Sequence, residues 1–169
     1  TLGAPDAVGL QVDLFHRASV DAALAELAQR WGHLNALVNA AGPLMGDLKS
    51  FETYTDEEWQ SVYSGLLMGA VRTIRAALPL MRKAEWARIV NVSAMSTKRQ
   101  SPSLVAYTSA KAALTSVSKN LSQSLAPEGI LVNTVSPGTF VSESFKAALA
   151  PIPDLDENDL REVMGYINR

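Results

Sequence analysis

The chain has 169 residues, enough for one domain with a buried core; 47% are hydrophobic and 19% charged. A formal net charge of −2, without a basic run, argues against nucleic acid or an anionic membrane as a partner. The absence of cysteine excludes disulfides and thiol chemistry, and two histidines are too few for a typical metal site. No apolar run approaches the ~20 residues of a membrane span, and the first residues do not resemble a signal peptide, so we expect a cytoplasmic protein.

The first quarter of the chain alternates between predicted strand and helix. Alternating apolar residues predict a buried strand over Ala7 to Leu14, with Asp13 near its end. A helix is predicted to begin at Ser19 and to end at Gly32. A short apolar run predicts a second buried strand over Leu34 to Asn39.

The same alternation continues after a predicted loop. Thr55, followed by three acidic residues, is a typical helix N-terminus. We expect one long helix from Glu57 to Lys83, bent or ended by Pro79. Two further strands are predicted over Arg88 to Ser93 and Ile130 to Val135. Repeated strand–helix units indicate an α/β domain, with a mostly parallel sheet covered on both faces by helices.

The clearest chemical signal is the stretch Tyr107-Thr108-Ser109-Ala110-Lys111. Its ends are four residues apart, so on a helix Tyr107 and Lys111 share one face. An ammonium beside a phenol in a dry cleft favours the phenolate, which makes tyrosine a usable general acid or base. Apolar residues at helical spacing support the helix, and Pro127 and Gly129 stop it. Because such pairs are common on helix surfaces, the spacing alone does not establish a site.

Several polar or turn-forming residues follow predicted strands. In open parallel sheets, ligands bind outside the carboxyl ends of the strands. Each of these residues alone is equally compatible with a turn or a cap, but their shared edge favours a binding site. They are Asp13, Asn39 to Gly42, Ser93 and Pro137-Gly138.

Four segments, in order and spacing, resemble the classical short-chain dehydrogenase/reductase family. They are Asn39-Ala40-Ala41-Gly42, Ile89-Val90-Asn91-Val92-Ser93, Tyr107-x-x-x-Lys111 and Val135-Ser136-Pro137-Gly138. The resemblance extends over nearly the whole chain, as a single Rossmann-like domain over residues 1–169 with a doubly wound sheet. It implies an oxidoreductase that uses NAD or NADP and transfers a hydride between the nicotinamide and a ketone or secondary alcohol. A 3-oxoacyl thioester is one candidate substrate.

The resemblance also implies roles for individual residues. Tyr107 would exchange a proton with the substrate oxygen, and Lys111 would lower the tyrosine pKa and hold the nicotinamide ribose. The adenine would be bordered by Asp13 and Leu14, and the adenosine side would be lined by Asn39, Ala40, Ala41 and Gly42. The nicotinamide end would face Pro137, Gly138 and Ser142; Ser142 stands where the family usually has threonine. In the family the two long helices pair across a two-fold axis, which implies a homodimer or homotetramer.

Some family elements have no counterpart in this sequence. The family's first strand and its glycine-rich pyrophosphate turn would precede Thr1, and its last strand would follow Arg169. We therefore expect an incomplete version of the fold, as in the middle of a longer chain. The residues that choose between NAD and NADP, and those that select the substrate, fall largely in these parts.

Two catalytic positions also depart from the family. Aligned from Tyr107, the family serine falls on Ala94, which leaves Ser93 and its neighbour Ser96 as the serines that could stand in for it; we take Ser93 as the candidate catalytic serine. Alternation along a strand points Ser93 away from the cleft unless the strand end bends. The family's helix asparagine corresponds to Leu66. The alternative is therefore a catalytically impaired binding or scaffold protein; without a Gly-x-Ser-x-Gly motif, a hydrolase has little support.

Overall fold

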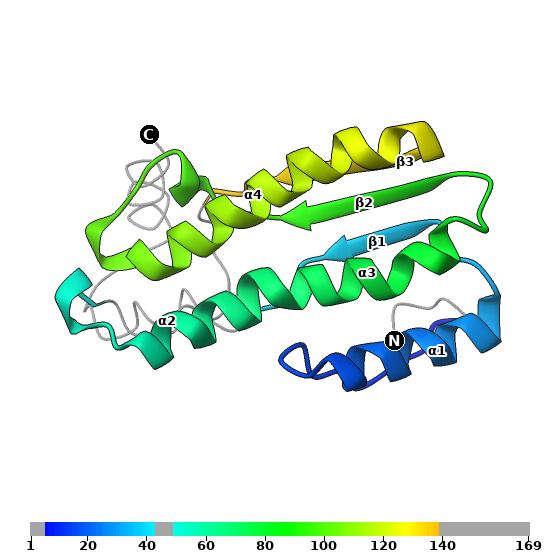
Figure 1. Cartoon of the computed structure of the whole chain (residues 1–169), viewed down its shortest axis with the longest axis horizontal. Helices are drawn as coiled ribbons and strands as arrows, with labels where there is room; N and C mark the ends of the chain where they lie inside the picture. The colour runs from blue at the N-terminus through cyan, green and yellow to red at the C-terminus, as the bar shows by residue number, and fades with distance from the viewer. Residues whose placement is uncertain (1–5, 43–48, 139–169) are drawn as a thin grey trace, which may run out of the picture.

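The structure, a computed structural model, describes residues 6–42 and 49–138 (Figure 1). Its sheet has three parallel strands in the order β1–β2–β3, which span Ala36–Asn39, Ala87–Val92 and Ile130–Val135. The register places Leu37, Ile89 and Val132 side by side across the sheet. Helices connect these parallel strands, so the predicted α/β architecture is confirmed.

Within the described ranges, four α-helices accompany the sheet: α1 over Arg17–Trp31, α2 over Asp56–Tyr63, α3 over Gly69–Met81 and α4 over Val105–Leu125. Thr55 caps α2 as predicted, since its hydroxyl accepts from the Glu58 N–H while the Glu58 carboxylate accepts from the Thr55 N–H. Among the described residues, no helix is long and apolar enough to cross a membrane.

The predicted long helix is divided in the structure. A π-helical segment over Ser64–Met68 joins α2 to α3, and Pro79 lies within the last turn of α3. A π segment accommodates one extra residue in a helical turn and is frequent at functional sites. Periodicity predicted the helical path but not this change of winding.

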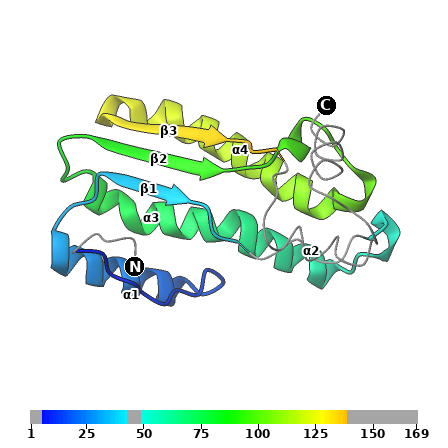
Figure 2. The same ribbon diagram turned by 180° about the vertical axis from the view of Figure 1, so that it is seen from behind.

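Helices cover one face of the sheet in the described part of the chain. α3 and α4 lie on that face and α1 packs against α3 (Figure 1), whereas the strands are in front in the view from behind (Figure 2). The opposite face carries Val38, Leu131 and Val135, whose exposed fractions are 61%, 44% and 50%. We expected helices on both faces of the sheet, but within the described residues they cover one face only.

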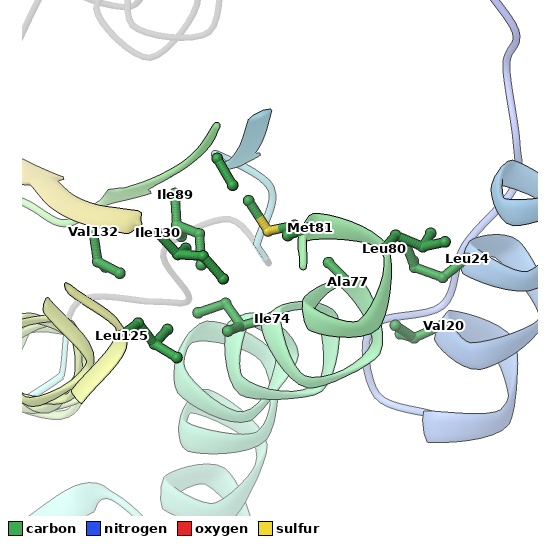
Figure 3. Close-up of a cluster of buried hydrophobic side chains, with 11 residues drawn as sticks. Val20, Leu24, Ile74, Ala77, Leu80, Met81, Ile89, Leu125, Ile130 and Val132 are labelled. Carbon is green, nitrogen blue, oxygen red and sulfur yellow. The ribbon is translucent and has the colours of Figure 1, made fainter. Parts of the chain in front are cut away.

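The core lies between the covered face of the sheet and helices α1, α3 and α4 (Figure 3). Its members are apolar residues that recur at helical spacing on α3 and at every second position on β2 and β3. The most buried are Val20, Ala77, Met81, Ala87, Ile89 and Ile130.

The predicted strand over Ala7 to Leu14 is wrong. The described sheet consists of β1, β2 and β3, so this segment has no neighbouring strand there with which to exchange hydrogen bonds. It ends in a turn in which the Asp13 N–H donates to the Ser19 hydroxyl, and α1 then begins at Arg17 rather than at Ser19. An alternating pattern does not supply a pairing partner, and the apolar residues of this segment are half-buried or exposed.

Candidate active site

The predicted site segments come together where the three strands end. Asn39 is the last residue of β1 and Ala40 to Gly42 follow it, Ser93 follows β2, and Pro137-Gly138 follow β3. Helix α4 reaches the same edge, because the Lys111 Nζ donates a hydrogen bond of 2.8 Å to the Val92 carbonyl. This is the edge at which open parallel sheets bind their ligands.

Tyr107 and Lys111 lie next to each other on α4. Both are half-buried, and the Lys111 Nζ is 5.8 Å from the centre of the Tyr107 ring. Burial raises the pKa of Tyr107 and lowers the pKa of Lys111. The expectation that Lys111 lowers the phenol pKa is therefore wrong for this structure: desolvation disfavours the phenolate, and the ammonium is hydrogen-bonded to Val92.

One peptide group fixes the side of β2 on which the ammonium lies. The Ser93 N–H donates to the Val135 carbonyl on β3, at 2.8 Å. In a trans peptide the carbonyl points opposite to the N–H of the same group, so the Val92 carbonyl points toward β1. The Lys111 ammonium is thereby placed between the ends of β1 and β2, on the side of Asn39.

Ser93 faces α4 and not the open edge. Its side chain is 4% exposed; its Oγ donates to the Lys111 carbonyl at 3.1 Å and lies 2.8 Å from the Thr115 Oγ1. This hydroxyl is committed to the helix, so the choice of Ser93 as the catalytic serine is corrected. The alternation of side chains along the strand continues to the strand end, as the sequence reasoning had allowed.

The neighbouring positions do not supply an obvious replacement. Ala94 follows in extended conformation and is 9% exposed. The Ser96 Oγ is buried and has no hydrogen-bond partner among the described residues. Leu66 is 6% exposed, and a Cβ added at Gly42 would lie 2.8 Å from its Cδ2. Leu66 therefore packs against the turn after β1, where Gly42, which has no Cβ, leaves room for this close approach.

Part of the predicted adenosine site surrounds a small cavity. Leu14, Asn39 and Ala41 line it, together with apolar side chains of α1, β1 and α3, and its volume is about 170 Å³. Ala40 and Gly42 are exposed beside it. The lining of this cavity is largely apolar, and the described residues hold no cluster of three potential metal ligands.

Asp13 precedes Leu14, which lines this cavity, but the Asp13 side chain takes part in a turn. Its carboxylate accepts from the Phe15 N–H at 2.8 Å and pairs with the His16 Nδ1 at 2.9 Å. These hydrogen bonds, the His16 contact foremost, lower the pKa of Asp13. The carboxylate is exposed, as an adenine-bordering group would need to be, but it is not part of the cavity lining.

The predicted nicotinamide side is described only in part. The Pro137 carbonyl accepts from the Met95 N–H at 3.0 Å, which connects the segment after β3 to the segment after β2. Pro137 is half-buried and Gly138 is exposed. Ser142 lies outside the described residues.

Sequence reasoning missed a buried polar chain that crosses the sheet. The Asn39 Nδ2 donates to the Asn91 Oδ1, and the Asn91 Nδ2 donates to the Ser118 Oγ, both at 2.8 Å. Asn91 is fully buried and Ser118 is 2% exposed. The signal was available, since an asparagine inside an apolar strand requires a buried hydrogen-bond partner.

Known proteins are similar to this chain in sequence. A family model described as short chain dehydrogenase matches residues 2–151. An uncharacterised oxidoreductase of Staphylococcus aureus strain MW2 is 28% identical over 156 residues, and the match covers 91% of this chain and 66% of the relative. The D-beta-hydroxybutyrate dehydrogenase of Rhizobium meliloti is 32% identical over 115 residues, which cover 68% of this chain and 44% of that protein.

The fold of this chain is also similar to that of a solved structure. It is the NADPH-bound structure of a short chain oxidoreductase from Pseudomonas aeruginosa PAO1, described as containing an atypical catalytic center. It is 25% identical, with a TM-score of 0.76, and the match covers 82% of this chain and 53% of that one. The chain thus spans about half to two thirds of the length of these relatives. From the family match over most of its length and the strand-end site, the chain belongs to the short-chain dehydrogenase family.

Proposed function

We propose that the protein is an NAD(P)-dependent oxidoreductase that interconverts a ketone and a secondary alcohol, with Tyr107 as the general acid and base. The observation that carries this proposal is the Lys111 ammonium, held at the end of β2 beside the Tyr107 ring. Tyr107 is the proton donor of the pair. Its phenol is protonated at neutral pH already at the ordinary tyrosine pKa of about 10, and burial raises that pKa further; the protonated form is the one that can give a proton to a carbonyl oxygen.

The same edge supports the cofactor assignment. Leu14, Asn39 and Ala41 line the cavity that we assign to the adenosine end, and Lys111 would hold the nicotinamide ribose. Pro137, Gly138 and Ser142 are proposed for the nicotinamide end. When bound, NAD or NADP supplies or accepts the hydride at the carbonyl carbon. NADPH in the Pseudomonas aeruginosa structure supports a nicotinamide cofactor in this chain.

The substrate class is proposed from the reaction and from one relative. Tyr107 gives its proton to the carbonyl oxygen in reduction, and the phenolate takes the hydroxyl proton in oxidation. The name of the Rhizobium meliloti relative supports a compound with oxygen at its third carbon, in line with the 3-oxoacyl candidate. The small exposed residues Ala112 and Ser116 on α4 permit close helix packing between copies, which supports a homodimer or homotetramer.

A second function is favoured by the missing serine. Ser93 faces the helix and Ala94 carries no hydroxyl, so neither position offers the serine donor of the family pattern. Losing one donor to a developing oxyanion can reduce the rate by a factor on the order of 10²–10³. The alternative is therefore a protein that retains the fold and binds the cofactor but has little turnover.

The experiment compares Tyr107→Phe with the unaltered protein on a panel of ketones and 3-oxoacyl compounds with NADH and NADPH. Removing the phenol oxygen is expected to lower kcat by roughly 10²–10⁴-fold while cofactor binding, followed by fluorescence, is retained. Tyr54→Phe is the matched control, because Tyr54 packs on Trp59, 5.9 Å between ring centres, in the segment before α2.

The possible outcomes of this experiment distinguish the two proposals. Loss of turnover in Tyr107→Phe alone supports the oxidoreductase proposal. If Tyr107→Phe retains most of its activity, Tyr107 is not the proton donor. Cofactor binding by the unaltered protein, without turnover of any compound, supports the binding or scaffold protein instead.

A further inference from the structure

Two consecutive residues at the end of β2, Val92 and Ser93, contact the side chain and the main chain of Lys111. Its Nζ donates to the Val92 carbonyl at 2.8 Å, and its own carbonyl accepts from the Ser93 Oγ at 3.1 Å. The backbone of Ser93 is in turn fixed to β3 by the 2.8 Å hydrogen bond from its N–H to Val135. The side chain and the main chain of Lys111 are therefore both hydrogen-bonded to the same two residues at the end of β2.

We infer that Ser93 is a positioning residue, which fixes the rotation and height of α4 on the sheet so that the Lys111 ammonium meets the Val92 carbonyl beside Tyr107. This inference rests on the proposed function and replaces the role of substrate donor that the sequence suggested for Ser93. Ser93 acts through the backbone of Lys111 and does not touch the reacting atoms.

The surroundings of the Ser93 hydroxyl support this role. The Thr115 Oγ1 lies 2.9 Å from the Lys111 carbonyl oxygen and 2.8 Å from the Ser93 Oγ, so the two hydroxyl protons serve three close oxygen–oxygen contacts. The Ser93 hydroxyl, the Thr115 hydroxyl and the Lys111 carbonyl oxygen thus form one cluster, and Thr115 lies one helical turn after Lys111. With Ser93 buried at 4% exposure, water has little access to replace its hydroxyl.

A second sheet-to-helix contact provides a matched control. Ser118 is attached to β2 through the Asn91 Nδ2, and its hydroxyl also donates to the Leu114 carbonyl. Ser118 comes seven residues after Lys111, roughly 10 Å further along the helix axis. Both serines are buried and both connect α4 to β2, but only Ser93 contacts Lys111.

The test measures Lys111 directly, without turnover. The protein is labelled with ¹³C-lysine, the Lys111 ε-methylene signal is assigned with Lys111→Arg, and its pH titration is followed in the unaltered protein, Ser93→Ala and Ser118→Ala. Burial lowers the pKa of Lys111 in the intact arrangement. In Ser93→Ala we expect the midpoint to rise toward the ordinary lysine value as the ammonium leaves the strand end. In Ser118→Ala it should remain in place.

Steady-state kinetics provide the second readout. A small displacement of a catalytic group can cost on the order of 10²-fold, so Ser93→Ala should lower kcat by 10- to 100-fold with little change in KM. Thr115→Val, which retains Ser93, should show a smaller loss and serves if Ser93→Ala does not fold. An unchanged Lys111 titration in Ser93→Ala, or an equal change in Ser118→Ala, would overturn the inference. Absence of turnover in the unaltered protein would contradict the proposed function but leave the titration as a test of positioning.

Discussion

At the scale of single residues, burial raises the pKa of Tyr107. The ring is partly enclosed, which raises the phenol pKa above its ordinary value of about 10. The Lys111 ammonium is close, but it faces the ring and the Val92 carbonyl. Sequence spacing correctly indicated that the two side chains are neighbours. It could not indicate which atom the ammonium faces, because that depends on where the strand end places its carbonyls.

A pH titration tests this assignment. In the protein without cofactor, the Tyr107 phenol should ionise above the ordinary tyrosine value, since the buried phenolate lacks hydration. The measurement is the difference in phenolate absorbance between the unaltered protein and Tyr107→Phe, with circular dichroism as the check on folding at each pH. Reduction, which needs the protonated phenol, should therefore persist through neutral pH. Ionisation of Tyr107 near neutral pH would show that Lys111 dominates over burial.

At the scale of elements, glycines set the ends of two segments. Gly32 follows α1 with φ +71°, and Gly129 follows α4 and its short 3₁₀ extension with φ +74°. The sequence predicted both endings, because left-handed backbone strongly favours glycine. The same local rules predicted Thr55 as a cap. They failed for residues 7–14, since strand formation requires a partner that local patterning does not specify.

Gly129→Ala isolates the cost of that conformation. A Cβ at Gly129 would meet nothing within 4 Å, so the loss of stability comes from the backbone alone and should be about 1–2 kcal/mol. Gly9→Ala is the control: a Cβ there is equally free of contacts, and the backbone φ is not in the left-handed region. Urea unfolding followed by circular dichroism measures both. A loss at Gly129 no larger than at Gly9 would mean that the turn relaxes to another conformation.

The direction of the Ser93 side chain could be predicted only in part from the strand pattern. Period-two alternation predicted that Ser93 points away from the cleft unless the strand end bends, and the structure places it against α4. The π segment at Ser64–Met68 had no comparable signal, because helical periodicity is nearly the same on both sides of it. The site was therefore predictable as a set of segments at one edge, whereas the roles of its hydroxyls required the packing of α4 on β2.

At the scale of the whole molecule, the sheet has one covered and one open face in the described residues. Ile130 and Leu131 are consecutive on β3, and their exposed fractions are 1% and 44%. The same sequence pattern predicted a sheet covered on both faces, since strands buried on both sides read as continuous apolar runs. The described helices α3 and α4 account for the cover on the Ile130 side.

Two alanine substitutions of equal size test this asymmetry in solution. Ile130→Ala removes fully buried methyl groups from the core and should lower the free energy of unfolding by about 2–5 kcal/mol. Leu131→Ala removes the same number of carbons from a half-exposed side chain and should cost well under half as much. Urea unfolding of both variants gives the comparison, with retained far-ultraviolet circular dichroism as the check on folding. Equal losses would show that a second layer covers the Leu131 face in solution, because only burial makes the two side chains equivalent.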